Sequence, residues 1–543
     1  MITVLLKLPW REAQSWPGVS GKRAGLMLYV SILVELLRSR PALAVWLAAL
    51  TQALLWTLVP VLFYGAPPGN LATSISIGHE FPLGTYLGPP MAFWLGEVVY
   101  DLSGHHLFGV YLLSQICVVV TYWAVFELGR ATVGAQQAAL AVLLMAGMSA
   151  FTVPTPEFGP VVLTMPLWAV ILLHYWRAVG EGRRRYWVAL AVEIGLLLLT
   201  TYAGLLLVGL LSLFTLVNRR ARASLGSTDP WLAGIVAVMI TFPHLLWLAE
   251  SGEGVLNVWG RLRAPESVVA NFSALLKQGV FILGSHAGLA VLVALVVGWP
   301  WGEREPAPVI VRKPIEPFVR QFIYFFAILP MLVSTCLAVL VGLSMPIGGI
   351  APLVILSALA IVVAAGDGIE LAHQRLVIPA WFGLLLVPPA LTVVAIFALP
   401  WLGIPLNVNQ PARAMAQFFD ESYQRRLGAP LPIVAGDPRT AALIAISAPS
   451  RPSLFFDAAP ERSSWLTMDD LKTKGAILVW PTTDTSGAPP AALKARFPDL
   501  VPEVSPRAFE RPVPGRLPLL RIGWAVIRPQ NQQGVTPPAG SVP

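Results

Sequence analysis

The stretch GAPPGNLATSISIGHEFPLGTYLGPPMAFWLGEVVYD, residues 65–101, decides the reading of the chain because it separates two long apolar runs. Its prolines and glycines exclude a bilayer-crossing helix, since a lipid-exposed backbone must satisfy its own hydrogen bonds. Aromatic residues such as Tyr86 and Trp94 carry amphipathic rings of the kind that settle at a membrane–water boundary. The stretch therefore predicts a membrane-surface loop with one or two interfacial helices, and its acidic and histidine residues are candidates for chemistry.

The composition of the 543-residue chain is that of a polytopic membrane protein, with 56% hydrophobic and only 12% charged residues. Soluble domains carry about 25% charged residues. The formal net charge of +8 comes from short Lys and Arg clusters beside apolar runs, which is how membrane orientation is encoded. We therefore expect membrane lipids, and no nucleic acid, as partners. Cys117 and Cys336 both lie in apolar runs, which predicts neither a disulfide nor a metal site.

The runs on either side of the loop are the first of eleven predicted membrane spans in a transmembrane domain over 42–400. The predicted spans are 42–64, 108–128, 133–153, 160–178, 187–201, 204–217, 230–249, 278–299, 321–342, 348–366 and 377–400. A shorter run at 24–37 contains Glu35 and predicts an interfacial helix in a cytoplasmic N-terminal segment, residues 1–41. A true span is the alternative for this run.

Basic clusters test this count, because Lys and Arg concentrate in cytoplasmic loops. With the N-terminus in the cytoplasm, the loop at 65–107 is outside. Two clusters of basic residues, Arg183–Arg185 and 218–222, here called the basic knots, are then both inside. Both knots can lie inside only if the apolar run between them folds as two short helices that turn near Thr200–Gly204. The sequence therefore predicts a helical hairpin rather than one long helix.

Beyond Trp401 the composition changes to ordinary polarity with many prolines, which predicts a small soluble α/β domain over 401–528 on the outer face. Its expected strands are 431–437, 475–480 and 519–527, and its expected helices are 408–427 and 465–473. The tail at 529–543 is rich in Gln, Pro and Gly, and it is predicted to be disordered.

Two carboxylates at the outer face are candidates for a catalytic base. Glu80 lies in the first outer loop, and Glu157 lies in PTPEFGP between the third and fourth spans. If these loops face each other, the two acids lie beside a polar cavity at the membrane boundary. That arrangement suits glycosyl transfer from a lipid-linked donor, in which one carboxylate deprotonates the acceptor hydroxyl. The alternative is that each acid is simply solvated.

Cations for a lipid phosphate come from the outer loop at 250–277, because a guanidinium can bind phosphate through two parallel hydrogen bonds. The candidates are Arg261, Arg263 and Lys277, with ordinary interfacial charge as the alternative. Further candidates for the polar cavity are His79, Tyr86, Glu97, Tyr202 and His244. For a histidine near a span end, such as His244, a hydrogen bond between packed helices is the alternative reading.

Several other classes of protein are disfavoured by the residues themselves. The chain has no GxxxxGK[ST], CxxC, HExxH or GxSxG pattern. Ionisable residues within the spans are scarce, Glu193 being the clearest, whereas a proton-coupled transporter would carry more of them. Lipid or solute transport stays open as an alternative function.

The segment GHEFPLGTYLGPPMAFWLGE, residues 78–97, resembles the outer-loop signature of the bacterial glycosyltransferase family 39 proteins. These are relatives of the dolichyl-phosphate-mannose–protein mannosyltransferases and the lipid A aminoarabinose transferases, and the resemblance extends over about 42–527, including SAPSRPS at 447–453. It implies a GT-C fold with about 11 transmembrane helices and a polyprenyl-phosphate-linked sugar as donor. It further implies a lipid, glycan or protein acceptor, and a bacterial inner-membrane location with the C-terminal domain in the periplasm. No cofactor is required by it, and a divalent cation is left open.

Three positions depart from the family pattern. Where relatives have an acidic residue after the first span, taken as the base, this chain has Asn70. Where they often have lysine, before the Pro-Pro pair and in the fifth-span turn, it has Leu87 and Thr201. Either Glu80 or Glu157 then replaces the usual base. The alternative is a catalytically silent relative that binds polyprenyl lipid or scaffolds an envelope assembly.

Overall fold

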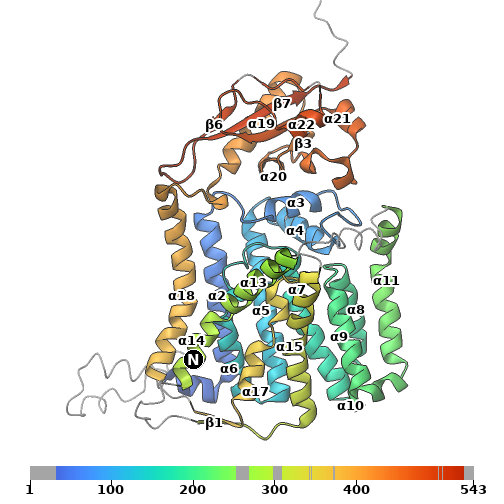
Figure 1. Ribbon diagram of the computed structural model, residues 1–543, viewed down its shortest axis with the longest axis vertical. Helices are drawn as coiled ribbons and strands as arrows, with labels where there is room; N and C mark the ends of the chain where they lie inside the picture. Colours follow the sequence, from blue (N-terminus) through green and yellow to red (C-terminus); the bar gives the residue numbers. More distant parts are fainter. Residues whose placement is uncertain are drawn as a thin grey trace, which may run out of the picture.

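The structure is a computed structural model, and it describes residues 32–251, 268–297, 309–340, 343, 345–370, 374–498, 500–503 and 505–530. A helical part forms the lower portion of the molecule in Figure 1, and a mixed α/β domain covers its upper end. Between them lie the two short helices of the first loop, α3 (Leu71–Gly78) and α4 (Met91–Leu102). The interfacial helices expected from the sequence are thus present.

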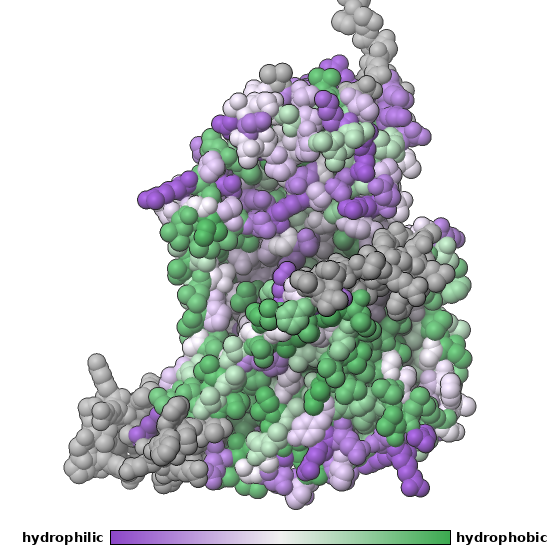
Figure 2. Space-filling view, in the orientation of Figure 1, coloured by the Kyte–Doolittle hydropathy of each residue, from purple (hydrophilic) through white to green (hydrophobic). Residues whose placement is uncertain are grey.

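Six helices of the described chain are long and apolar enough to cross a membrane by length and composition. They are α2 (Pro41–Phe63), α5 (Leu107–Thr132), α7 (Pro160–Tyr175) with its continuation to Gly180, α11 (Asp229–Glu250), α15 (Pro317–Leu340), and α18 (Gln374–Ala398) with its continuation to Leu402. Figure 2 shows hydrophobic residues covering this part between the hydrophilic upper domain and a hydrophilic region near its lower end. A bilayer rather than water is the solvent that such a surface fits.

The remaining predicted spans are shorter or bent, so the expected count of eleven is met only in part. Two bent pairs raise the number of candidate spans in the described chain to at most eight: α9 (Gly204–Val217) with α10 (Arg219–Arg222), and α13 (Val268–Ser285) with α14 (Ala287–Val297). The shorter apolar helices are α6 (Ala135–Ala146), α8 (Tyr186–Leu198), α16 (Ile350–Leu353) and α17 (Ser357–Ala364). The predicted helical hairpin is confirmed, since α8 ends at Leu198 and α9 begins at Gly204.

Both basic knots lie at the end of the helical part that is farthest from the α/β domain (Figure 1). Arg184 forms a bidentate ion pair with Asp229 at the start of α11, and Arg220 of α10 donates to the carbonyl of Gly180 at 2.8 Å. The chain therefore returns to the same end after the hairpin. Also at this end are two short strands, β1 (Val309–Val311) and β2 (Gly368–Glu370), paired antiparallel.

The C-terminal domain contains a five-stranded sheet in the order β4-β3-β5-β7-β6. The strands are β3 (Ile433–Gly436), β4 (Ser453–Phe455), β5 (Ala476–Thr482), β6 (Arg507–Phe509) and β7 (Leu520–Ile527). The first three in the order are parallel, and β7 runs antiparallel to both of its neighbours. The helices are α19 (Ala412–Leu427), α20 (Pro438–Ser447), α21 (Met468–Lys474) and α22 (Ala491–Arg496). All three expected strands are present, whereas β4, β6, α20 and α22 were not predicted.

Helix α20 joins the two parts of the molecule, because it packs on α3 from above while its other side covers the sheet. Asp437 caps this helix by accepting a hydrogen bond from the backbone N–H of Thr440 at 2.9 Å. Alternating buried residues of β3 and β5 face α20 on one side of the sheet. The first outer loop and the C-terminal domain therefore share one interface, and the candidate site lies along it.

Candidate functional site

The α3–α4 pair is held together by backbone contact at one glycine. A Cβ on Gly78 would lie 2.1 Å from the carbonyl oxygen of Phe93, so only glycine allows this approach. The chain then turns through Phe81, whose φ of 43° lies in the left-handed region, before it reaches Leu83. This turn places His79 and Glu80 at the end of α3, beside the acidic face of α4.

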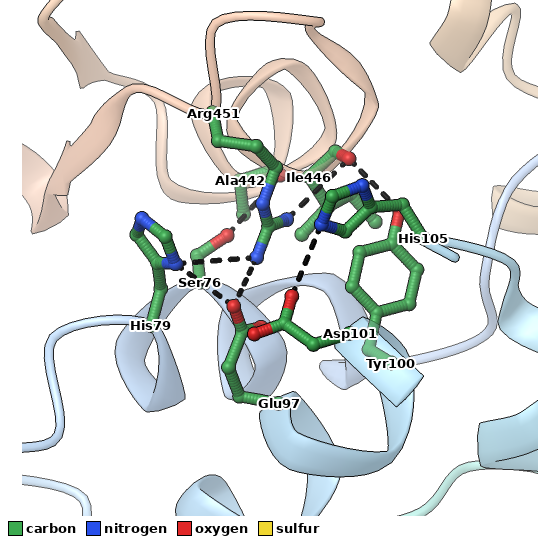
Figure 3. A network of polar contacts seen from close by, with 9 residues as sticks. All are labelled: Ser76, His79, Glu97, Tyr100, Asp101, His105, Ala442, Ile446 and Arg451. Atoms are coloured by element: carbon green, nitrogen blue, oxygen red, sulfur yellow. Dashed lines mark hydrogen bonds and ion pairs between the residues drawn. The ribbon is translucent and has the colours of Figure 1, made fainter. Parts of the chain in front are cut away.

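Glu97 is the buried centre of a polar network between the loop and the C-terminal domain (Figure 3). Its side chain is 0% exposed, and its Oε1 accepts hydrogen bonds from Nδ1 of His79 at 2.8 Å and from the Arg451 guanidinium. Nδ1 of His79 carries the proton here, because the Glu97 carboxylate can only accept a hydrogen bond. The His79 side chain remains 38% exposed.

The network changes the acidity of both partners. The hydrogen bond to Glu97 raises the pKa of His79 above its ordinary value, although burial opposes this. Burial by itself would raise the pKa of Glu97, but the hydrogen bonds from His79 and Arg451 outweigh it and lower that pKa. Glu97 is therefore a carboxylate at neutral pH, with Arg451 as its permanent counter-charge.

Arg451 also contacts Tyr100, with the guanidinium carbon 4.9 Å from the ring centroid. The Tyr100 hydroxyl donates to the carbonyl of Ile446 at 2.9 Å, which fixes α4 to the end of α20. Oε2 of Glu97 and Nε of Arg451 are buried and have no hydrogen-bond partner among the described residues. Such unpaired buried atoms are costly, and they are frequent where a ligand or a water completes the site.

A second contact between the two parts of the molecule surrounds Asn70. The Asn70 backbone N–H donates to Oε1 of Glu157 at 2.8 Å, while the Asn70 residue itself is exposed. Gly69 has a φ of +48°, and a Cβ there would lie 2.0 Å from the carboxyl carbon of Glu157. Glu157 is therefore packed directly against the backbone of residues 67–70, here called the PPGN turn.

Arg439 of α20 holds the same turn from the other side. Its guanidinium donates to the carbonyls of Pro67 at 3.1 Å and Gly69, and also to the carbonyl of Asn407 at 2.9 Å. Burial lowers the pKa of Arg439, an effect that the nearby Glu157 carboxylate opposes. The turn before Asn70 thus lies between the carboxylate of Glu157 in the transmembrane part and the guanidinium of Arg439 in the C-terminal domain.

Glu80 differs from Glu157 in that its carboxylate makes no hydrogen bond to the PPGN turn within the described part of the chain and has one buried oxygen without a partner there. The residue is half-buried, and its Oε1 is buried with no hydrogen-bond partner among the described residues. Its charge is close enough to His79 to contribute to the raised pKa of that histidine. Of the two acids proposed from the sequence, Glu80 is the one with a buried oxygen that lacks a partner among the described residues.

His244 and Tyr202 contact each other beside Leu83, in the segment that joins α3 to α4. Nδ1 of His244 contacts the carbonyl of Leu83 at 2.9 Å, and its Nε2 contacts the Tyr202 hydroxyl at 3.2 Å. Trp247 stacks on the histidine at 5.7 Å, and a Cβ on Gly84 would lie 2.2 Å from the Trp247 ring. These residues attach the loop to α11, and the two hydrogen-bond partners of His244 both lie outside helices.

The other sequence candidates are more scattered. Tyr86 contacts the C-terminal domain, with its ring 5.0 Å from that of Phe456, and burial raises its pKa to about 12. Lys277 is exposed on α13, whereas Arg261 and Arg263 lie outside the described residues. The described chain contains no group of three or more His, Cys, Asp or Glu residues placed to hold a metal ion.

Two arginines of the candidate site were not identified from the sequence, namely Arg439 and Arg451. Both belong to the C-terminal domain, and their partners in the first loop lie more than 350 residues earlier in the chain. The only signal was that Arg451 lies in SAPSRPS, one of the segments that carry the family resemblance. No periodicity or local motif marks either residue.

Comparison with known proteins agrees with this architecture. Residues 88–247 match the family described as dolichyl-phosphate-mannose-protein mannosyltransferase. The structure of ArnT from Cupriavidus metallidurans bound to undecaprenyl phosphate is similar, with a TM-score of 0.53 and 14% identity over 89% of this chain and 98% of that chain. The apo structure of the same protein gives 0.52 and 15% identity over 91% and 99%. No curated protein matches the sequence.

The expected resemblance to GT-C glycosyltransferases is therefore confirmed, and the chain has the fold of that multi-pass membrane class. The family match begins at Gly88 and ends at Trp247, so it includes Glu97, Glu157 and His244. The structural likeness extends over the C-terminal domain as well, because it covers nearly all of both chains.

Proposed function

We propose that the protein is a membrane glycosyltransferase that moves a sugar from a polyprenyl-phosphate donor to a hydroxyl group of a lipid, glycan or protein. The observation that carries this proposal is the family match over 88–247, which falls on the loop and helices that surround the candidate site. The donor class is supported by the ArnT structure, which is described as bound to undecaprenyl phosphate. The fold likeness alone supports the architecture and not the donor or the reaction.

The proposed location is the bacterial inner membrane, with the candidate site and the C-terminal domain on the periplasmic side. Support comes from the position of the two basic knots, which lie at the end of the helices opposite to the C-terminal domain. Because Lys and Arg are retained on the cytoplasmic side, that end faces the cytoplasm. A polyprenyl chain can then stay in the bilayer while its headgroup reaches the site.

In the proposed reaction Glu80 is the general base. The acceptor hydroxyl gives its proton to the Glu80 carboxylate as its oxygen attacks the anomeric carbon of the sugar. The bond from that carbon to the phosphate oxygen breaks, and its electron pair leaves with the polyprenyl phosphate. One displacement inverts the anomeric centre. Arg261, Arg263 and Lys277 remain the proposed cations for the leaving phosphate.

Glu157 and Asn70 have a different role in this scheme. An amide cannot take up a proton at neutral pH, so Asn70 does not replace the missing acid. Because Oε1 of Glu157 is committed to the Asn70 backbone N–H, we assign Glu157 to positioning the PPGN turn. This revises the sequence-based hypothesis that either acid could be the base.

The test is sugar transfer by the purified protein in proteoliposomes that contain a labelled polyprenyl-phosphate sugar and a bacterial lipid extract. Glu80→Gln should lower turnover by about a hundredfold or more, which is the usual contribution of a general base. Asp469→Asn is the matched control, because this acid is 89% exposed on α21 of the C-terminal domain. Equal turnover in Glu80→Gln and wild type would exclude Glu80 as the base.

A catalytically silent relative is the second candidate, and the neutral residues at Asn70, Leu87 and Thr201 favour it. Such a protein would still bind the polyprenyl lipid but would release no labelled product. Asn70→Asp separates the two candidates: activity that appears only in this variant identifies an intact scaffold without its native base. Activity in the wild type rejects the silent reading.

A further inference from the structure

A large cavity lies between the membrane part and the C-terminal domain, next to the polar network already described. This cavity, here called the chamber, has a volume of about 1070 Å³. Its floor is formed by the outer ends of α2 and α5, and its roof by α19 and the end of α20. Tyr100, His105, Ile446 and Arg451 in Figure 3 belong to its wall. It therefore opens at the level where lipid headgroups lie.

The chamber continues into an apolar groove along α5. This groove, here called the chain groove, has a volume of about 510 Å³, and it shares His106 and Phe108 with the chamber. It descends along Leu112 and Ile116, whose side chains are 40% and 49% exposed. A polar chamber joined to an apolar groove is the shape of one amphipathic lipid, with its headgroup above and its chain beside the helix.

An unpaired buried hydroxyl on the chamber wall is evidence for the kind of headgroup that the chamber binds. Tyr111 of α5 lines the chamber and is only 2% exposed, yet its hydroxyl has no hydrogen-bond partner among the described residues. Its ring is fixed edge-to-face against Tyr64, with 6.5 Å between the centroids. A buried hydroxyl usually has a partner, and a ligand with hydroxyl groups would supply one here.

The charges of the chamber disfavour a phosphate. Its acids are Asp420, Glu421 and Glu510, whereas its guanidinium groups are Arg413 and Arg451, and His105 and His106 also lie on its wall. His105 is hydrogen-bonded to Asp101. Arg451 is already committed to Glu97. Carboxylates accept hydrogen bonds from sugar hydroxyls but repel a phosphate dianion.

From the joined shape, the unpaired Tyr111 hydroxyl and this charge balance, we propose that the chamber and the chain groove bind a lipid with an uncharged, polyhydroxylated headgroup. This lipid is the acceptor of the sugar, and to that extent the inference rests on the proposed function. It narrows the acceptor class from lipid, glycan or protein to a glycolipid that reaches the site from the α2–α5 side.

The test is photo-crosslinking of the whole protein in phosphatidylcholine nanodiscs. The probe is a diacylglycerol with a disaccharide headgroup and a diazirine in one chain, and the labelled peptides are identified by mass spectrometry. Label should appear on α5 between Leu107 and Ile116, and unlabelled probe should displace it while undecaprenyl phosphate should not. Displacement by undecaprenyl phosphate would make the chamber a donor site and overturn the assignment.

Two variants sharpen the result. Tyr111→Phe keeps the packing and removes the hydroxyl, so labelling should fall about threefold to tenfold. Leu112→Trp should fill the chain groove and abolish labelling, whereas the control Leu54→Trp, at a 58% exposed position of α2, should not. Unchanged labelling in both Tyr111→Phe and Leu112→Trp overturns the site. Because labelling needs no transfer, a labelled but inactive protein would reject the proposed function and leave the lipid site standing.

Discussion

The energetics of the candidate site depend on a few residues whose charges are buried. Glu97 is fully buried, and its two partners come from α3 and from the C-terminal domain. Removing one partner of a buried ion pair leaves a charge without compensation, which typically costs about 3–5 kcal/mol. The intact ion pair adds little net stability, because the cost of burying its charges offsets their attraction. Removing one partner should weaken the contact between the first loop and the C-terminal domain.

The first prediction concerns Arg451. Arg451→Met keeps much of the side-chain volume and removes the charge, so it should lower the thermal unfolding temperature and expose α20 to proteolysis. Lys472→Met is the control, because Lys472 lies in the same domain and its ion pair with Asp469 is exposed. The double variant with Glu97→Gln should recover part of the loss, since no buried charge then remains. Equal stability of Arg451→Met and the control contradicts the assignment.

The second prediction is a pH dependence. The pKa of His79 is raised in the folded protein, so its contribution to stability is complete below its ordinary pKa of about 6.5. That contribution is lost as the pH rises through the raised value. Between about pH 6 and about pH 9 the unfolding temperature of wild type should therefore fall more steeply than that of His79→Gln. Parallel curves for the two proteins would show that His79 is not coupled to folding.

At the scale of elements, the PPGN turn is the part whose position depends on both halves of the molecule. Glu157 holds it from the α7 side, and Arg439 of α20 holds it from above. Local sequence predicted only that this part belongs to a membrane-surface loop, from its prolines and glycines. It could not predict these two partners, because Arg439 and Gly69 are 370 residues apart in the chain. Pairing over such a distance is decided by packing, and no local pattern records it.

The third prediction tests Arg439 as a positioning residue. Arg439→Ala should lower kcat by about tenfold or more while KM for the lipid donor stays unchanged, because the turn would be displaced and not the donor site. Arg439→Lys should recover only part of the activity, since an ammonium cannot reproduce the fork of hydrogen bonds. Arg425→Ala, on the exposed end of α19, serves as the control. A rise in KM alone would assign Arg439 to donor binding instead.

For the whole molecule, composition and charge pattern predicted a multi-pass helical membrane protein and the hairpin, and apolar runs beyond Trp401 predicted three of the five strands of the C-terminal sheet. The count of eleven spans is met only in part in the described chain, for a physical reason visible at α6. Four of its residues, namely Ala138, Ala139, Ala141 and Val142, are completely buried by neighbouring helices. A helix enclosed by protein need not match the thickness of the bilayer. Apolar length therefore overestimates the number of full spans when short helices fill the interior.

The last prediction concerns the orientation of the whole molecule in the membrane. A background without native thiols, Cys117→Ser with Cys336→Ser, carries a single new cysteine, either Asp469→Cys on the C-terminal domain or Arg185→Cys in the basic knot. Both positions are exposed. A membrane-impermeant maleimide added to cells with a permeabilised outer membrane should label Asp469→Cys, and should label Arg185→Cys only after the inner membrane is disrupted. The positive-inside rule requires this order because the two positions lie at opposite ends of the helices. The reverse order would place the candidate site in the cytoplasm and exclude a periplasmic transfer.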